Sequence, residues 1–311
     1  MGPRIVILDE VELSDDQLRR LEGLGRLVRH TSNPASENEV VRRLDGAEVA
    51  VLGWTSLGRQ ILSQLPELRL VAIWATGYDY VDVAAANDRS IVVTNVPAYA
   101  GRAVAELTIG LMLALARRIV PADRSVHDGR FSWQGFQGTE LAGKVLGVVG
   151  VGDIGREVAR LGACLGMEVV GHARTATAER AAQLGVELVP LHELLRRSQV
   201  VSLHVPLTAD THHLIGPREL ATVRPGAFLI NTARAGVVDQ SALVDALRTG
   251  RLGGAALDDH DHPAPTLAAL PNVVLTPHIG FCTAEGLVRK GNVCVDNVAA
   301  FLAGKPQNVV N

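Results

Sequence analysis

The stretch Lys144–Gly155 reads KVLGVVGVGDIG, and it decides the fold of the chain around it. The apolar run Val145–Val149 predicts a buried strand, and the pattern G-x-G-x-x-G follows it directly. A helix-forming segment, Arg156–Leu165, comes next. Glycines in a turn between a strand and a helix are typical of a dinucleotide-binding sheet, whereas the same glycines without those flanks would indicate an ordinary glycine-rich turn.

Each glycine of this turn has its own predicted role. Gly150 makes the tight turn, Gly152 lets the backbone approach a pyrophosphate, and Gly155 lets the helix pack closely on the strand. The helix N-terminus, where Asp153 and Ile154 lie, attracts the negative charge of the phosphates.

The end of the next predicted strand, Glu168–Gly171, indicates which dinucleotide is preferred. An acid there binds the ribose hydroxyl of NAD, but this chain has Ala173, Arg174 and Thr175 instead. Ala173 removes the repulsion of a 2′-phosphate, Arg174 can pair with that phosphate, and Thr175 can add a hydrogen bond. We therefore expect NADP to be preferred, with NAD possible. The alternative interpretation of Arg174 is a solvated loop arginine.

Strand-like and helix-like segments alternate on both sides of the glycine turn, which predicts parallel sheets built from βαβ units. The predicted strands before the turn are Arg4–Leu8, Ala47–Gly53, Leu70–Trp74 and Ile91–Thr94, and those after Glu168–Gly171 are Val200–Val205, Ala227–Asn231, Gly254–Leu257 and Val273–Thr276. Between the two series, a long helix over Arg102–Ile119 precedes a loop-rich stretch, Pro121–Leu141.

The last predicted helix, Ala284–Leu302, has no place in a completed doubly wound sheet. We expect it to return to the first domain. The predicted organisation is an α/β substrate-binding domain over residues 1–100, completed by 283–311, with a dinucleotide-binding domain over 101–282 inserted into it.

Composition narrows the class of protein. The chain has 311 residues, of which 47% are hydrophobic, and a net charge of −3 without a basic run, so no nucleic-acid partner is expected. The cysteines, Cys164, Cys282 and Cys294, are far apart and predict neither a disulfide framework nor a metal site. The N-terminus lacks a signal-peptide pattern, and the apolar stretch Leu107–Ala116 is too short to span a membrane. A cytoplasmic location is expected.

Besides the glycine turn, the chain carries the motifs ATGYD (75–79), NVP (95–97), VAELT (104–108), HVPLT (204–208), NTARAGVVD (231–239) and TPHIG (276–280). In their order and spacing, these motifs resemble the D-isomer-specific 2-hydroxyacid dehydrogenase family, in particular its glyoxylate and hydroxypyruvate reductases. The resemblance implies an α/β fold in which a Rossmann-type doubly wound nucleotide-binding domain is inserted into a flavodoxin-like substrate domain. It also implies a homodimer.

The resemblance implies that Arg234 binds the substrate carboxylate and polarises the carbonyl, and that His278 donates the proton. It assigns Asp258 to the nicotinamide carboxamide. The family usually has a glutamate as the partner of the histidine, and Asp261, one methylene shorter, stands at that position here. We expect Asp261 to pair with His278, with Asp259 as the alternative partner.

The resemblance also implies two sets of contacts. Further contacts to the cofactor come from Val104, His204, Val205, Pro206, Thr211, Thr232, Ala233, His278 and Gly280. Those to the substrate come from Thr76, Gly77, Tyr78, Tyr99, Arg102, Arg234 and His278. Phosphite-oxidising relatives have a lysine where this chain has Thr76, which argues against phosphite. Arg102 would favour a second negative group on the substrate if it faces the cleft, and otherwise is a surface arginine.

The predicted function is reduction of a small 2-oxo acid to the D-2-hydroxy acid, reversibly, with hydride from the nicotinamide and a proton from His278. One alternative substrate is a dianionic 2-oxo acid that carries a phosphonate or a second carboxylate. Another alternative is a catalytically weak dinucleotide-sensing protein, like the corepressors that share this fold. The absence of long disordered tails argues against that second alternative.

Overall fold

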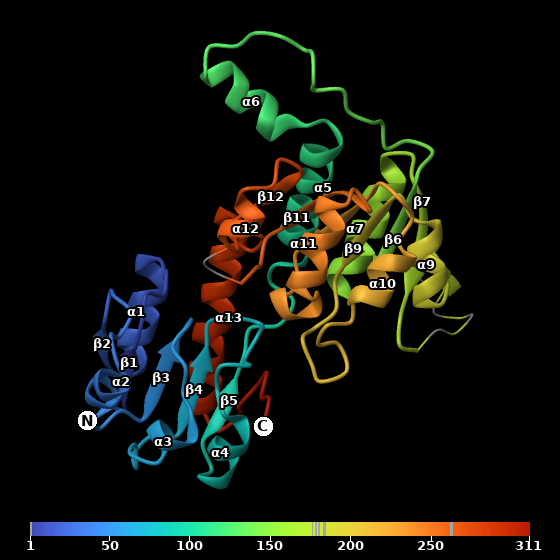
Figure 1. Cartoon of the computed structure of the whole chain (residues 1–311). Coiled ribbons are helices and arrows are strands. Elements are labelled where there is room, and N and C mark those ends of the chain that lie inside the picture. Colours follow the sequence, from blue (N-terminus) through green and yellow to red (C-terminus); the bar gives the residue numbers. More distant parts are fainter. Residues whose placement is uncertain (1, 176, 178, 180, 183–184, 262–263) are drawn as a thin grey trace. The chain divides into compact units, whose positions relative to one another are not determined.

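The computed structural model describes residues 2–175, 177, 179, 181–182, 185–261 and 264–311 (Figure 1). The chain divides into two compact units, one formed by Met1–Ala100 with Cys282–Asn311 and the other by Gly101–Phe281. Each unit is built on a parallel sheet of its own.

The first unit has a five-stranded sheet of order β2-β1-β3-β4-β5, which is the flavodoxin-like order. Its strands are β1 (Arg4–Ile7), β2 (Arg26–Arg29), β3 (Val49–Leu52), β4 (Leu70–Ile73) and β5 (Val92–Thr94). Strands β3 and β4 read VAVL and LVAI and are buried along their whole length. Continuous apolar runs of this kind are typical of parallel strands that are covered on both faces.

Helices of the first unit cover the sheet. They are α1 (Asp15–Leu24), α2 (Glu37–Leu44), α3 (Arg59–Leu62), α4 (Val83–Asp88) and α13 (Ala284–Leu302). A capping box between Ser14 and Gln17 starts α1. Helix α13 packs on α1 and β4, and Gln17 Nε2 donates to Val288 O and Asn292 Oδ1, both at 3.0 Å. The last helix therefore belongs to the first unit.

A buried aspartate organises the carboxyl edge of this first sheet. Asp9 follows β1, is fully buried, and accepts hydrogen bonds from the backbone N–H groups of Gly53, Trp54 and Thr55 at 2.8–2.9 Å. These donors are the first residues after β3. Asp9 thus fixes the loop that follows the neighbouring strand, at the edge where α/β sheets bind their ligands.

The second unit has a seven-stranded sheet of order β12-β11-β10-β9-β6-β7-β8. The strands are β6 (Val145–Val149), β7 (Glu168–His172), β8 (Glu187–Leu188), β9 (Val200–Leu203), β10 (Ala227–Asn231), β11 (Leu252–Leu257) and β12 (Val273–Leu275). The order extends a Rossmann sheet by one strand, and the direction of winding reverses between β6 and β9. A ligand is expected at that switch point, beyond the carboxyl ends of these two strands.

Helices α5 (Gly101–Ala116) and α7 (Asp153–Cys164) pack against each other, and α5 also covers β10, β11 and β12. The other helical segments are α6 (Ile119–His127), α9 (Leu191–Arg197), α10 (Pro217–Thr222), η1 (Ala235–Val237), α11 (Gln240–Arg248) and α12 (Pro265–Ala268). No helix in the described part of the chain is both long enough and apolar enough to cross a membrane.

The sequence interpretation was wrong for part of the stretch between α5 and β6. Helix α5 ends at Ala116 because Arg118 adopts a left-handed backbone conformation, with φ at 52°. Helix α6 then begins at Ile119 and continues to His127, where a loop was predicted. Pro121 lies in the first turn of α6, where its missing N–H breaks no helical hydrogen bond. The short edge strands β2 and β8 were not predicted either.

We predict that Asp9→Ala lowers the free energy of unfolding by about 3 kcal/mol, because one buried and two partly buried N–H groups lose their carboxylate acceptor. Urea denaturation of the full chain measures this change. Asp88→Ala is the control, since Asp88 forms an exposed ion pair with Arg59 at 2.8 Å. Its loss should cost less than about 1 kcal/mol. Equal effects of the two substitutions would contradict the role given to Asp9.

Candidate active site

The glycine turn after β6 tolerates no side chain at two of its three glycines. Gly150 has φ at 93°, and a Cβ there would lie 2.5 Å from the backbone oxygen of His204. A Cβ on Gly155 would lie 1.9 Å from the oxygen of Gly150. Gly152 differs, because a Cβ on it would meet no described atom within 4 Å, and it starts α7 without a side-chain cap. The first turn of α7 therefore offers backbone donors to an anion, and the residues present fit a dinucleotide pyrophosphate.

The residues predicted to select the cofactor follow β7 directly. Ala173 is half-buried, and Arg174 and Thr175 are exposed. Arg174 forms no ion pair or side-chain hydrogen bond with the rest of the described chain. No carboxylate stands at the end of this strand, where the exposed Arg174 lies.

His204 follows β9, on the other side of the switch point. Its Nε2 lies 2.8 Å from Ser202 Oγ, and burial lowers the pKa of His204 to about 3. The ring is therefore neutral at physiological pH and acts as a hydrogen-bonding group, not as a proton carrier. Beyond it, Thr211 Oγ1 donates to Pro206 O at 2.6 Å and closes the loop.

Arg234 is held by the loop that follows β10. The Asn231 side chain, at the end of β10, accepts from Ala233 N at 3.0 Å and donates to Arg234 O at 2.9 Å. Asn231 is 1% exposed, and both bonds are at least partly buried. Next to it, Thr232 Oγ1 lies 3.0 Å from Thr108 Oγ1. Asn231 is therefore a positioning residue that the sequence did not reveal, because only its hydrogen bonds show the role.

Asp258, at the end of the adjacent strand β11, holds the loop that carries His278. Its buried carboxylate accepts from Thr276 Oγ1 at 2.6 Å, Ile279 N at 2.9 Å and Gly280 N at 2.8 Å. His278 N also donates to the backbone oxygen of Asp258 at 2.8 Å. Asp258 therefore holds this loop in place, in addition to the contact with the cofactor that the sequence predicts for it. Gly280 packs closely here, since a Cβ on it would lie 2.9 Å from Asp258 Oδ2 and 3.4 Å from Val104.

His278 itself has a left-handed backbone conformation with φ at 56°, which is uncommon for a residue with a side chain. Its side chain is 40% exposed, and Nδ1 lies 3.7 Å from Asp259 Oδ2. Asp259 thus lies within ion-pair range of His278, and Asp261 is exposed. The structure favours the alternative partner, and the pairing of Asp261 stays a prediction.

The predicted substrate loop belongs to the first unit. Thr76 Oγ1 donates to Val96 O at 2.7 Å, and Asn95 Nδ2 donates to Thr76 O at 2.8 Å, so the loop is fixed to the segment after β5. Tyr78 is exposed and Tyr99 is buried. In the second unit, Arg102 forms an exposed ion pair with Glu106 at 2.9 Å, as expected of a surface arginine.

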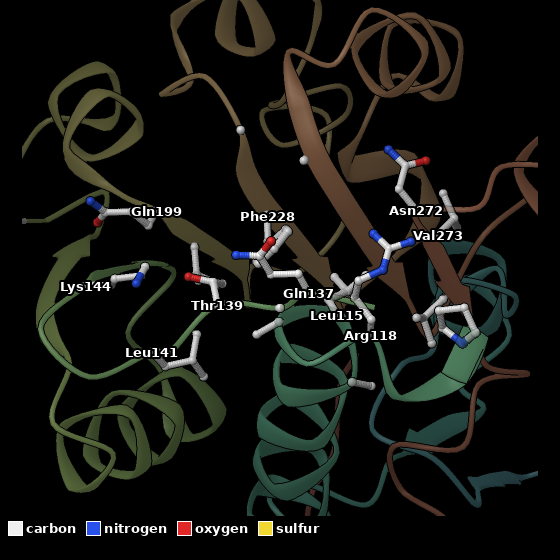
Figure 2. A pocket seen from close by; sticks show the side chains of 18 of the residues that line it. Leu115, Arg118, Gln137, Thr139, Leu141, Lys144, Gln199, Phe228, Asn272 and Val273 are labelled. Atoms are coloured by element: carbon white, nitrogen blue, oxygen red, sulfur yellow. The ribbon is translucent and has the colours of Figure 1, made fainter. Parts of the chain in front are cut away.

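A separate pocket of about 380 Å³ lies at the amino ends of the strands of the second sheet (Figure 2). Leu115, Phe228 and Val273 contribute apolar surface, and Arg118 and Lys144 contribute positive charge. Its described lining includes none of the residues of the glycine turn. It is therefore a different place from the glycine turn, which lies at the carboxyl end of β6.

Known proteins are similar to this chain over most of its length. The family model of the D-isomer specific 2-hydroxyacid dehydrogenase NAD-binding domain matches residues 109–280. A glycerate dehydrogenase of Methylorubrum extorquens is 39% identical over 100% of this chain and 99% of its own. A glyoxylate reductase of Aeropyrum pernix is 43% identical over 81% and 78%. A solved acyclic imino acid reductase in complex with NADPH and D-Arg has a TM-score of 0.91 at 30% identity, covering 99% and 100%. The chain therefore belongs to the D-isomer-specific 2-hydroxyacid dehydrogenase family and is an NAD(P)-dependent oxidoreductase.

Proposed function

We propose that this enzyme is an NADP(H)-preferring reductase that converts a small 2-oxo acid to the D-2-hydroxy acid, reversibly. The observation that carries the proposal is the joint placement of Arg234 and His278. They follow β10 and β12, the strands on either side of β11, and the hydrogen bonds of Asn231 and Asp258 hold their loops. A guanidinium and an imidazole so fixed suit a substrate with a carboxylate beside a carbonyl.

The proposed roles follow from the chemistry of each group. A bound nicotinamide supplies or accepts the hydride. Arg234 binds the carboxylate in a planar, two-bonded arrangement and polarises the neighbouring carbonyl. His278 donates its proton to the carbonyl oxygen during reduction and takes it back during oxidation. The backbone of Thr76–Tyr78 provides further donors to the carboxylate, in the substrate-binding role proposed for the first unit.

The partner of His278 is proposed to be Asp259 in the free enzyme. A carboxylate beside the ring orients it and stabilises its protonated form. The 3.7 Å separation from Asp259 is longer than a hydrogen bond, so the ring and the carboxylate must approach further when substrate binds. Asp261, in the family position of the glutamate, is the second candidate.

The proposed substrates are glyoxylate and hydroxypyruvate, because relatives that match most of this chain are named glyoxylate reductase and glycerate dehydrogenase. A dianionic substrate has less support, since Glu106 already neutralises Arg102. Among the described residues, no feature of the site favours the sensing alternative.

We also propose a homodimer. Apolar side chains on α6 and the segment after it are exposed in the single chain, among them Phe131 at 96% and Trp133 at 79%. Exposed apolar surface of this kind is typical of a protein–protein interface. A second copy of the chain would cover it.

The cofactor preference gives the first test. Wild type should reduce glyoxylate with a kcat/KM about ten- to hundredfold higher for NADPH than for NADH, because Arg174 can form a charge-assisted bond to the 2′-phosphate. Steady-state assays with glyoxylate, hydroxypyruvate and pyruvate measure this ratio. Arg174→Ala should abolish the preference, and Arg160→Ala, which removes an exposed arginine paired with Glu157, should leave it unchanged. Equal use of NADH by wild type would leave Arg174 as a solvated loop residue.

The proton donor gives a second test. His278→Ala should lower kcat by about 10²–10⁴-fold and leave NADPH affinity nearly intact, since general acid catalysis is lost while the glycine turn is not touched. His213→Ala is a matched control, because His213 also has a left-handed backbone and lies 3.9 Å from Asp239. An unchanged kcat in His278→Ala would exclude this residue as the acid.

The carboxylate partner gives a third test, in which two substitutions are compared. Asp259→Asn should shift the alkaline limb of the pH–kcat/KM profile for reduction to lower pH, because the protonated imidazole loses a stabilising charge. Asp261→Asn should move the limb less. The reverse order would assign the role to Asp261, and two unshifted profiles would mean that neither aspartate serves.

A further inference from the structure

Lys290, on α13 of the first unit, is fully buried, and in the described part of the chain it is the largest side chain buried to this degree. Its ammonium lies 3.4 Å from the ring centroid of Trp74 and 5.3 Å from those of Trp54 and Tyr99. Lysine is rarely buried completely, and a cation at these distances is attracted to the faces of the rings. The side chain is thus enclosed by three aromatic residues.

These three rings come from three segments at one edge of the first sheet. Trp54 follows β3, and its backbone N–H donates to the Asp9 carboxylate. Trp74 follows β4, and Tyr99 follows β5. Trp74 is two residues before Thr76, where the predicted substrate loop begins. Lys290 therefore contacts, through its side chain, the segments that follow three neighbouring strands.

Neighbours of Lys290 on α13 reinforce the same segments. Arg289 Nε donates to Tyr99 O at 3.0 Å, and Asn297 Nδ2 donates to Asn95 O at 2.8 Å. Asn95 in turn donates to Thr76 O. Helix α13 thus holds the substrate loop in place, and Lys290 adds a formal charge to the aromatic enclosure.

Burial lowers the pKa of Lys290 to about 7, against the opposing influence of nearby acidic groups. Two of these groups, Asp9 and Glu12, belong to the segment after β1. The other two are the thiols of Cys282, just before α13, and of Cys294, on α13. Burial raises the pKa of Cys294 to about 12, so that thiol is neutral. Near neutral pH the ammonium is therefore partly deprotonated, and its charge falls as the pH rises through 7.

An unbranched apolar residue would fill this site without the cost of burying a charge. The presence of a lysine therefore indicates a use for the charge. We propose that Lys290 is a positioning residue that fixes the loop Thr76–Tyr78 and makes this edge of the first unit electropositive toward the carboxylate of the 2-oxo acid. This inference rests on the proposed function, because it concerns the same substrate loop. The residue acts through Trp74 and the loop, since its own ammonium is enclosed.

The test compares KM for glyoxylate, with saturating NADPH, in wild type and Lys290→Met at about pH 6 and about pH 8.5. Removing the charge should raise KM about three- to tenfold at the lower pH and have little effect at the higher pH, where the wild-type amine is neutral. The kcat should stay within about twofold, and the melting temperature should not fall, because the cost of burying a charge is removed. His278 is present in both proteins, so its titration cancels in the ratio.

Arg69→Met is the matched control. Arg69 also forms a cation–aromatic contact with α13, 5.7 Å from the ring of Phe301, but it precedes β4 and lies at the opposite edge of the sheet. It should leave KM unchanged at both pH values. Lys290→Arg keeps a charge at every pH, so its KM should equal that of wild type at pH 6 and lie below that of wild type at pH 8.5. This variant also keeps the proposal testable if Lys290→Met fails to fold.

A second measurement needs no turnover. The chain has three tryptophans, of which Trp54 and Trp74 contact Lys290. Tryptophan fluorescence of wild type should change with a midpoint near pH 7, and the transition should be absent in Lys290→Met. A KM ratio that is independent of pH, or a transition that persists in Lys290→Met, would overturn the inference. Absence of any 2-oxo acid reduction by wild type would instead refute the proposed function, and the fluorescence transition would still report on Lys290.

Discussion

The carboxyl edge of the second unit depends on one buried carboxylate. Asp258 joins the end of β11 to the loop after β12 through three donors, and the backbone of the same residue receives the N–H of His278. A buried charge is tolerated only when its hydrogen bonds are complete, and here they are made by the loop that carries the proposed proton donor. The left-handed backbone conformation of His278 costs free energy, and the hydrogen bonds of Asp258 hold the residue in that conformation.

The two units stabilise a buried charged group in different ways. In the second unit the charge belongs to a carboxylate and is balanced by N–H and O–H donors at hydrogen-bond distance. In the first unit Lys290 is enclosed by aromatic rings, whose faces attract a cation less strongly than an acid would. A carboxylate satisfied by donors in this way holds a fixed geometry. Burial lowers the pKa of Lys290 to about 7, so the influence of its charge varies with pH.

Much of the fold followed from the sequence, because buried parallel strands such as Val145–Val149 leave continuous apolar runs, and the glycine turn has a strict context. Strand β2 was missed because RLVR carries a charge at each end, and β8 because two residues make no pattern. Arg234 and His278 were named from their motifs, but the roles of Asn231 and Asp258 as holders of loops lie in hydrogen bonds that no motif specifies. Nothing in the sequence indicated that Lys290 is buried, since a lysine on a helix is usually exposed.

The division of the first unit into two stretches of chain has a consequence for biosynthesis. Residues Gly101–Phe281 are contiguous, so this unit can fold as soon as it leaves the ribosome. The first unit still lacks α13 at that moment, and with it the helix that covers β4. It also lacks residues 308–310, whose backbone bonds to Asn95 and Val93 close the edge of β5. Until synthesis is complete, the first unit therefore exposes an apolar face on β4 and an unpaired edge on β5.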